Sequence, residues 1–485
     1  MKSEITNYII EQLKSVADDM SDYAQKNHKW IANAPERNRL SINNFLNYLS
    51  LRSHDIRVFQ DLLHRKGLSS LAGSESHSLR QVQKVLKRLG CKIEEDELSK
   101  CSFGIGRKLL ADNATVLFGE KSEADIPYLM VTLDSSFLQQ PNMIADLLER
   151  GMSVARINCA HDDSEIWSAL IREVKIQSER LNRPCKIYMD LAGPKIRTYF
   201  HSKKIKKLIL NEGDELLLAE NPLPKSSTGK VVGCTLEGIT AMVKVGERVM
   251  FDDGEIETEV IGRRDKTLVL KVKRNSKVKK NLKSEKGINF PDSELTISSL
   301  TDYDRKCLSF VKKNADLVGF SFVKTVDDVK ELQEALKDVS YPPKIILKIE
   351  TPQAVNHLPQ LLLQGLQHDT LGIMIARGDL AVEIGFERMS EIQDEILWFC
   401  EAAHVPVIWA TQVLENLHKK GIATRSEITD AAHAVAAECI MINKGSYTLK
   451  VIDVLSDILQ RTGGHRAKKR YYMRPLSIAT NFVFE

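Results

Sequence analysis

From about residue 128 to residue 462, short apolar runs rich in β-branched residues alternate with longer amphipathic segments. Eight such runs begin at Tyr128, Val154, Lys186, Asp316, Lys344, Leu371, Val405 and Cys439. This alternation is typical of repeated β-α units, and eight parallel strands close a (β/α)8 TIM barrel. The same pattern also fits an open doubly wound sheet. We therefore predict an α/β fold and expect the barrel.

The segments between the runs have the apolar stripe of helices that pack on the outside of a barrel. Residues 163–181, 326–339 and 389–403 show it most clearly. A start signal supports one further helix, because Thr424 is followed three residues later by Glu427, the spacing of a capping box.

One connection is far too long for a β-α loop. Residues 199–287 contain alternating apolar and polar patches, which predict a small all-β domain inserted after the third strand. An insertion there would stand as a lid over the carboxyl-terminal rim, where barrel enzymes keep their active sites.

The remaining boundaries follow from this insertion. Residues 1–125 have helical patterns without a strand series, so we expect a separate N-terminal helical domain. The barrel then occupies residues 126–198 and 288–462, and a basic tail covers residues 463–485.

Composition restricts the partners and the compartment. The 69 basic residues nearly balance 65 acidic ones, giving a formal charge of +4, so no overall field favours nucleic acid or an anionic membrane. The lysine-dense residues 271–286 suit either binding of nucleic acid or polyphosphate or a solvated strand edge that lysines protect from aggregation, and we favour the strand edge. The eight cysteines are scattered and lack metal-ligand spacing, which indicates reduced thiols. No uncharged run is long enough to cross a bilayer. We expect a cytoplasmic protein without membrane or nucleic-acid partners.

Chemistry-bearing side chains gather at the ends of the predicted strands. Lys348 and Glu350 end the fifth strand on one side of it, and Asp379 follows the sixth strand. Two carboxylates from neighbouring strand ends suit a hard divalent cation such as Mg²⁺, and a lysine beside them suits phosphoryl transfer. The structural alternative is a Lys–Glu pair that plugs the barrel end.

Basic residues follow the second and third strands. Arg156, Lys195 and Arg197 suit a phosphate-rich substrate, because guanidinium groups bind phosphate in a bidentate manner. Salt bridges with Asp190 are the structural alternative. His161 and Thr411 each have an ordinary interpretation as well, as a solvated loop histidine and as a helix cap. The sequence contains neither GxxxxGK[ST] nor a GxGxxG after a strand.

Taken in order, these segments resemble the pyruvate kinase family over about residues 128–460. The segments are RINCAHDD, DLAGPKIRT, FDDGEI, KGINFPDSEL, ILKIE, GIMIARGDLAVEIG, WATQVLEN and TRSEITDAAHAV. GIMIARGDL and the preceding KIE are the most specific. The resemblance implies phosphoryl transfer from phosphoenolpyruvate to ADP, giving pyruvate and ATP, with Mg²⁺ or Mn²⁺.

The resemblance also implies roles for individual residues. Glu350 and Asp379 would bind the metal, and Lys348 would face the transferred phosphoryl group. Thr411 would help to protonate the enolate. The remaining positions would bind substrate or nucleotide: Arg156, Asn158, His161, Arg197, Ser321 and Gly378.

Several positions depart from the family pattern. Asn158 and Asp190 match monovalent-cation ligands, but Ala160 replaces the expected serine and Lys195 replaces the glutamate of potassium-dependent members. Because an ammonium supplies the charge that K⁺ would supply, and would repel K⁺ beside it, we predict activity without potassium.

Two loops and the chain end also differ. TLDSSF stands at residues 132–137 and NKGS at residues 443–446, in place of TIGPAS and SGET. The chain ends soon after the eighth helix, so we expect no C-terminal regulatory domain and no control by sugar phosphates there.

Two other functions fit parts of this pattern. A metal-dependent lyase acting on phosphoenolpyruvate or pyruvate would use Glu350 and Asp379 without ADP. A non-catalytic metabolite sensor would explain the altered loops. By analogy with the family we expect a homo-oligomer, specifically a dimer.

Overall fold

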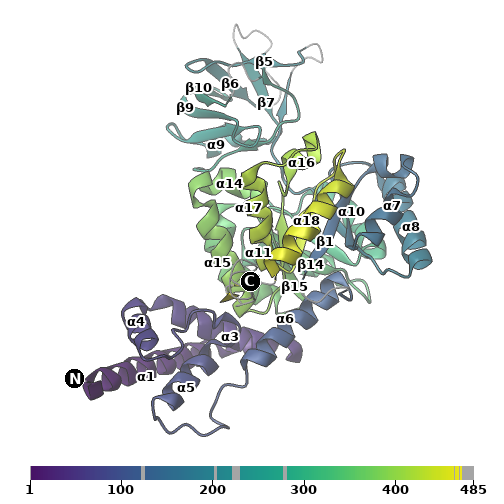
Figure 1. Cartoon of the computed structure of the whole chain (residues 1–485). Coiled ribbons are helices and arrows are strands. Elements are labelled where there is room, and N and C mark those ends of the chain that lie inside the picture. The colour runs from purple at the N-terminus through teal and green to yellow at the C-terminus, as the bar shows by residue number, and fades with distance from the viewer. Residues whose placement is uncertain are drawn as a thin grey trace, which may run out of the picture.

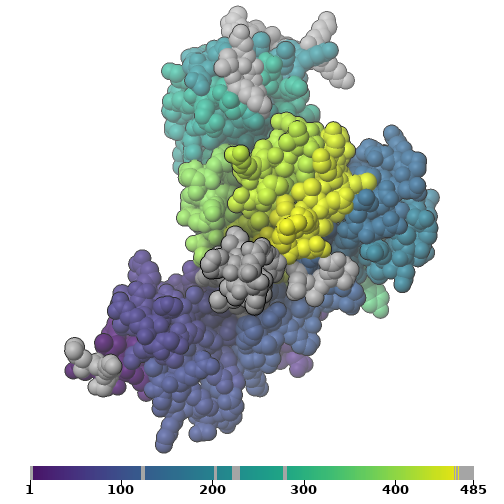
Figure 2. Space-filling view, in the orientation of Figure 1, coloured from purple at the N-terminus to yellow at the C-terminus, as the bar shows by residue number. Residues whose placement is uncertain are grey.

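The computed structural model describes residues 2–121, 126–200, 205–220, 230–276, 281–463, 465–468 and 470–471. Most of the predicted basic tail and residues 277–280 of the lysine-dense stretch lie outside the described residues. Three bodies follow one another in space, namely an N-terminal group of helices, a barrel and a second sheet (Figures 1 and 2).

Eight parallel strands close the predicted barrel, and the open-sheet alternative is wrong because β1 pairs with both β2 and β17. Their interior side chains form one buried apolar cluster that includes Met130, Tyr188 and Met374. The strands, in chain order, are β1 (Tyr128–Leu133), β2 (Met152–Asn158), β3 (Lys186–Asp190), β13 (Leu317–Phe320), β14 (Lys344–Ile349), β15 (Leu371–Ala376), β16 (Val407–Ala410) and β17 (Cys439–Ile442).

Helices surround the barrel and bury their apolar stripes against the outer faces of the strands. The predicted capping box of Thr424 and Glu427 is present at the start of one of them. The larger helices are α7 (Met143–Glu149), α8 (Ser164–Leu181), α10 (Asp302–Asn314), α11 (Val326–Ala335), α13 (Leu358–Gly365), α15 (Met389–Ala402), α17 (Arg425–His433) and α18 (Thr448–Gly463). Shorter ones are α12 (Pro352–Asn356), α14 (Arg377–Ile384) and α16 (Glu415–Lys420).

A separate seven-stranded sheet lies between β3 and β13 in the sequence and stands beyond one end of the barrel (Figure 1). We call it the inserted sheet. It has its own apolar core, which includes Leu216, Phe251 and Leu270. Its strands are β4 (Thr198–Tyr199), β6 (Glu215–Ala219), β7 (Val231–Cys234), β8 (Arg248–Phe251), β9 (Ile256–Arg264), β10 (Thr267–Asn275) and β12 (Ile288–Asn289). The pair β5 (Leu208–Ile209) and β11 (Asn281–Leu282) and helix α9 (Ile239–Met242) accompany it.

The N-terminal segment is helical, as predicted, and packs at the opposite end of the barrel (Figure 1). It comprises α1 (Lys2–Lys26), α2 (His28–Asn33), α3 (Glu36–Ser53), α4 (Arg57–Arg65), α5 (Ser78–Arg88) and α6 (Phe103–Phe118). Leu117 and Phe118 at the end of α6 join the buried cluster inside the barrel. The ring of buried His404 bonds to Ser41 and to the carbonyl of Ser76, both at 2.9 Å. Apolar and polar contacts thus join this segment to the barrel.

None of the described helices is both long and apolar enough to span a bilayer. A short antiparallel pair, β18 (Arg466–Ala467) and β19 (Arg470–Tyr471), follows α18.

Candidate active site

Lys348 lies at the carboxyl end of β14, buried among three oxygen-bearing side chains. Its Nζ donates to Ser321 Oγ at 2.6 Å and lies 3.2 Å from Glu350 Oε1 and 3.3 Å from Asp190 Oδ1. Burial alone would lower the pKa of Lys348, but Asp190 and Glu350 raise it above its ordinary value. The ammonium therefore stays charged at the strand end, where it can face an anionic group.

Arg156 and Asp190 form a second buried pair, at the ends of β2 and β3. Arg156 donates to Asp190 Oδ2 from Nε at 3.0 Å and from Nη2 at 2.6 Å, and to Thr132 Oγ1 at 2.9 Å. Burial of Asp190 opposes its ionisation, yet Lys348 and Arg156 hold its pKa below the ordinary value. The salt-bridge alternative for Arg156 is thus present, within a cluster that carries two cations.

Glu350 directly follows β14, Asp379 lies in the first turn of α14 after the neighbouring strand β15, and the two carboxylates interact electrostatically. Burial raises the pKa of Glu350, and the charge of Asp379 raises it further, although Lys348 opposes this. A divalent cation between two carboxylates that repel each other would relieve this cost, so the pair fits Mg²⁺ or Mn²⁺. No three His, Cys, Asp or Glu side chains of the described residues form a metal cage. Water or substrate oxygens would therefore complete the coordination shell.

Lys195 forms an ion pair with Asp379. Its Nζ donates to Oδ1 at 2.9 Å and to Oδ2 at 3.0 Å. Asp190, one of the predicted monovalent-cation positions, is instead paired with Arg156 and Lys348. The structure thus places Lys195 at the candidate divalent-metal ligand, a contact that the sequence did not indicate.

Thr411 follows β16 in a strained conformation, with φ of 63°. A positive φ is uncommon for a β-branched residue. Its Oγ1 accepts from the backbone N–H of Gly378 at 2.8 Å and donates to the carbonyl of Ala410 at 2.7 Å. The interpretation of Thr411 as a helix cap is wrong, because α16 begins only at Glu415. Its hydroxyl instead joins the end of β16 to the first turn of helix α14, which carries Asp379.

His161 and Asn158 line a cavity of about 320 Å³ together with Arg156. Partial burial, Lys444 and Arg197 lower the pKa of His161, so its ring is neutral at physiological pH. Arg197 is half-buried and donates to the carbonyl of Glu285 at 3.1 Å, at the base of the inserted sheet. Arg156, Asn158 and His161 therefore share one cavity, and Arg197 lies beside it.

Two further residues of this cavity escaped the sequence reasoning. Lys444 Nζ lies 2.7 Å from Asp134 Oδ2, so the two altered loops meet at the wall of this cavity. Both loops had been identified as unusual, but their ion pair joins residues at opposite ends of the barrel sequence.

The chain is similar in sequence to proteins of known function. Residues 129–450 match the family model described as pyruvate kinase, barrel domain. A pyruvate kinase of Thermotoga maritima is 31% identical over 350 residues, which cover 71% of this chain and 72% of that protein. One of Debaryomyces hansenii is 30% identical, covering 65% and 62%, and one of Bacillus licheniformis is 30% identical, covering 66% and 54%. The chain thus spans less than two thirds of the last two relatives.

Proposed function

The chain belongs to the pyruvate kinase family, and from this premise we propose that it transfers a phosphoryl group from phosphoenolpyruvate to ADP. The observation that best supports this activity is the buried Lys348, which hydrogen-bonds Ser321 beside Arg156 and the candidate metal ligands. The oxygen–phosphorus bond of phosphoenolpyruvate breaks while a β-phosphate oxygen of ADP bonds to phosphorus. The enolate that leaves takes up a proton and becomes pyruvate.

The cations of the site suit the charge of this reaction. Lys348 and Arg156 are held by carboxylates, so they are already positioned where negative charge develops on the phosphoryl oxygens. Held by Glu350 and Asp379, Mg²⁺ or Mn²⁺ would supply further positive charge there. In this proposal the remaining predicted residues bind nucleotide or substrate: Asn158, His161, Arg197, Ser321, Gly378 and Thr411.

Potassium independence is a further part of the proposal. Asp190, which would be a ligand of K⁺, already has ion pairs with Arg156 and Lys348. Ala160 offers no side-chain oxygen. A K⁺ ion would meet two fixed cations at this position, which disfavours its binding. We also propose a cytoplasmic location. All eight cysteines are free thiols, which agrees with a reducing compartment. The dimer stays a prediction.

The test is pyruvate formation from phosphoenolpyruvate and ADP with Mg²⁺ or Mn²⁺ in potassium-free buffer. We expect turnover that needs both ADP and the metal, and a loss of about 10²–10³-fold in kcat for Lys348→Met. Lys344→Met is the matched control, because Lys344 begins the same strand and pairs with Asp369 at the other end of the barrel. It should retain most of the activity.

The other outcomes separate the alternatives. Pyruvate formation without ADP would favour the lyase, and the absence of turnover even with K⁺ present would favour the sensor. Turnover that begins only when K⁺ is added would refute potassium independence alone.

A further inference from the structure

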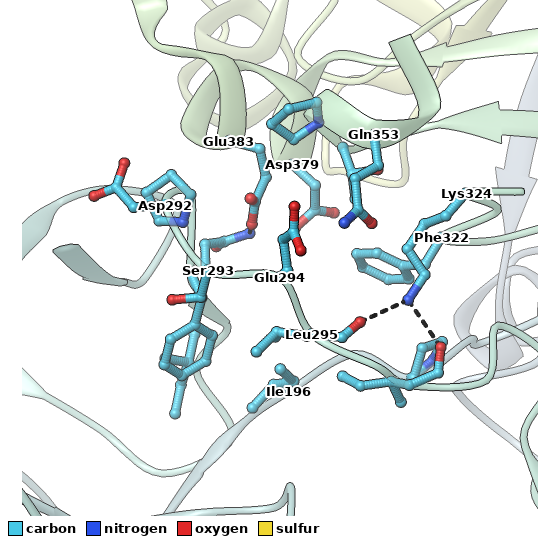
Figure 3. A pocket seen from close by; sticks show the side chains of 18 of the residues that line it. Ile196, Asp292, Ser293, Glu294, Leu295, Phe322, Lys324, Gln353, Asp379 and Glu383 are labelled. Carbon is cyan, nitrogen blue, oxygen red and sulfur yellow. Dashed lines mark hydrogen bonds between the residues drawn. The ribbon is translucent and has the colours of Figure 1, made fainter. Parts of the chain in front are cut away.

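A second cavity, of about 300 Å³, lies where the inserted sheet joins the barrel (Figure 3). Both connections of the sheet form its walls, through residues 194–196, 288–295 and 297, together with the loop after β13 and the helices α12 and α14. We call it the hinge pocket. Of the residues discussed above, Lys195 and Asp379 line it, whereas Lys348, Glu350 and Thr411 do not.

The walls of the hinge pocket combine apolar and polar side chains, with the apolar surface somewhat larger. Ile196, Phe290, Leu295 and Phe322 contribute side chains from both the hinge and the barrel. The volume lies at the lower end of the range found for ligand sites, which combine apolar walls with a few convergent polar groups. The pocket therefore has room for the body of a small organic molecule.

The two lysines of the hinge pocket already have their partners. Lys195 binds both oxygens of Asp379. Lys324 donates to the carbonyls of Leu295 at 3.1 Å and Ile297 at 2.8 Å, and burial lowers its pKa. The charge of Lys195 is thus offset by Asp379, whereas the ammonium of Lys324 is directed at the carbonyls of the 295–297 segment.

The carboxylates are not balanced in the same way. Asp292 pairs with Arg248 at 2.7 Å, but Glu294 has no ion pair or hydrogen bond among the described residues. Among the described residues Glu383 has no ion pair; it accepts from the amide of Asn289, at 2.8 Å, and from the backbone N–H of Phe290. Burial and the nearby charge of Asp379 raise the pKa of Glu383 to about 7.

Three of the carboxylates that line the hinge pocket are directed toward one end of it. Figure 3 shows the side chains of Glu294, Asp379 and Glu383 converging there, with the amide of Gln353 beside them. One end of the pocket thus offers hydrogen-bond acceptors and excess negative charge, and the rest offers apolar surface.

We propose that the hinge pocket binds a small organic cation, a primary ammonium carried on a compact apolar body. The ammonium donates to Glu383 and Glu294, and the apolar body packs between Phe290 and Phe322. Because both connections of the inserted sheet line the pocket, an occupant also restrains the orientation of the sheet over the barrel. This assignment does not depend on the proposed catalytic activity.

The test uses the full chain, without substrates or metal, and three aromatic probes of similar size and different charge. Benzylammonium, benzyl alcohol and benzoate are titrated separately, and binding is followed by ligand-observed NMR. We expect benzylammonium to bind best, with an affinity at least about tenfold above that of the other two. Equal binding of the three probes, preference for benzoate, or no binding of benzylammonium would overturn the proposal.

Variants locate the site. Glu383→Gln should weaken benzylammonium binding about tenfold while keeping the shape of the pocket. Glu294→Lys should abolish it by placing an ammonium at the same end, and this exposed side chain makes no contact that folding requires. Glu395→Gln is the matched control, because Glu395 is exposed on α15 away from the pocket. Unchanged binding in both pocket variants, or an equal loss in the control, would refute the assignment.

Discussion

Replacing Lys195 by glutamine is expected to tighten the binding of Mn²⁺ to the substrate-free protein. Both oxygens of Asp379 accept hydrogen bonds from Lys195, at 2.9 and 3.0 Å. A metal ion that binds Asp379 must displace this ammonium or share the carboxylate with it, and the two cations repel each other. A glutamine amide can form only a neutral hydrogen bond in its place. Electrostatic repulsion of the metal ion is therefore smaller, and its Kd is lower.

The size of the effect follows from the burial of the pair. The side chains of Lys195 and Asp379 are 28% and 16% exposed, so the pair is neither a surface pair nor a fully buried one. Exposed pairs contribute up to about 1 kcal/mol, whereas breaking a buried one costs about 3–5 kcal/mol. We take a value near the lower bound, ~1.4 kcal/mol, which is a tenfold decrease in the Kd for Mn²⁺.

The assay is a titration with Mn²⁺ in which free Mn²⁺ is measured by electron paramagnetic resonance. Lys286→Gln is the matched control, because it removes the same charge from a lysine that pairs with Asp252 of the inserted sheet at 2.8 Å. It should change the Kd less than about twofold, since the Lys195–Asp379 pair remains. Mn²⁺ affinity that is unchanged or weaker in Lys195→Gln, or equally improved in the control, would refute the reasoning.

Further predictions concern stability, measured as the free energy of unfolding in urea by tryptophan fluorescence. Asp190→Asn leaves two buried cations without their shared carboxylate and should cost about 3–5 kcal/mol, whereas Asp453→Asn, in an exposed pair with Arg150, should cost less than about 1 kcal/mol; equal costs would contradict the account. Leu117→Ala empties a fully buried site at the base of the barrel and should cost about 2–5 kcal/mol; a cost below about 1 kcal/mol would show that α6 does not seal it. Burial lowers the pKa of His404 to about 4, so its neutral form stabilises the fold fully above pH ~6.5 and progressively less as pH falls toward 4. The wild type should lose about 2 kcal/mol more than His404→Gln between pH 7 and pH 5; parallel losses would exclude this role.

Much of the fold could be predicted because its elements are local. Each barrel strand is an apolar run bounded by polar residues, and the capping box of Thr424 and Glu427 lies within four residues. Strand alternation likewise placed Lys348 and Glu350 on one side of β14, and the structure brings their charged groups to 3.2 Å.

The position of the N-terminal helices could not be predicted in this way. Their docking depends on contacts such as that of His404 with Ser41, which are separated by 363 positions. The sequence indicated helices there, but an apolar stripe does not specify which surface covers it.

What the sequence determined by itself was the order and type of the elements, together with the residues that stand at the strand ends. Hydrophobic periodicity and chain alternation act over a few residues, so they can be read without coordinates. Only the tertiary structure decided which charges meet. Lys195 and Asp379 lie 184 positions apart, and their pairing, like the hinge pocket beside it, exists because barrel closure and the inserted sheet bring two distant loops together.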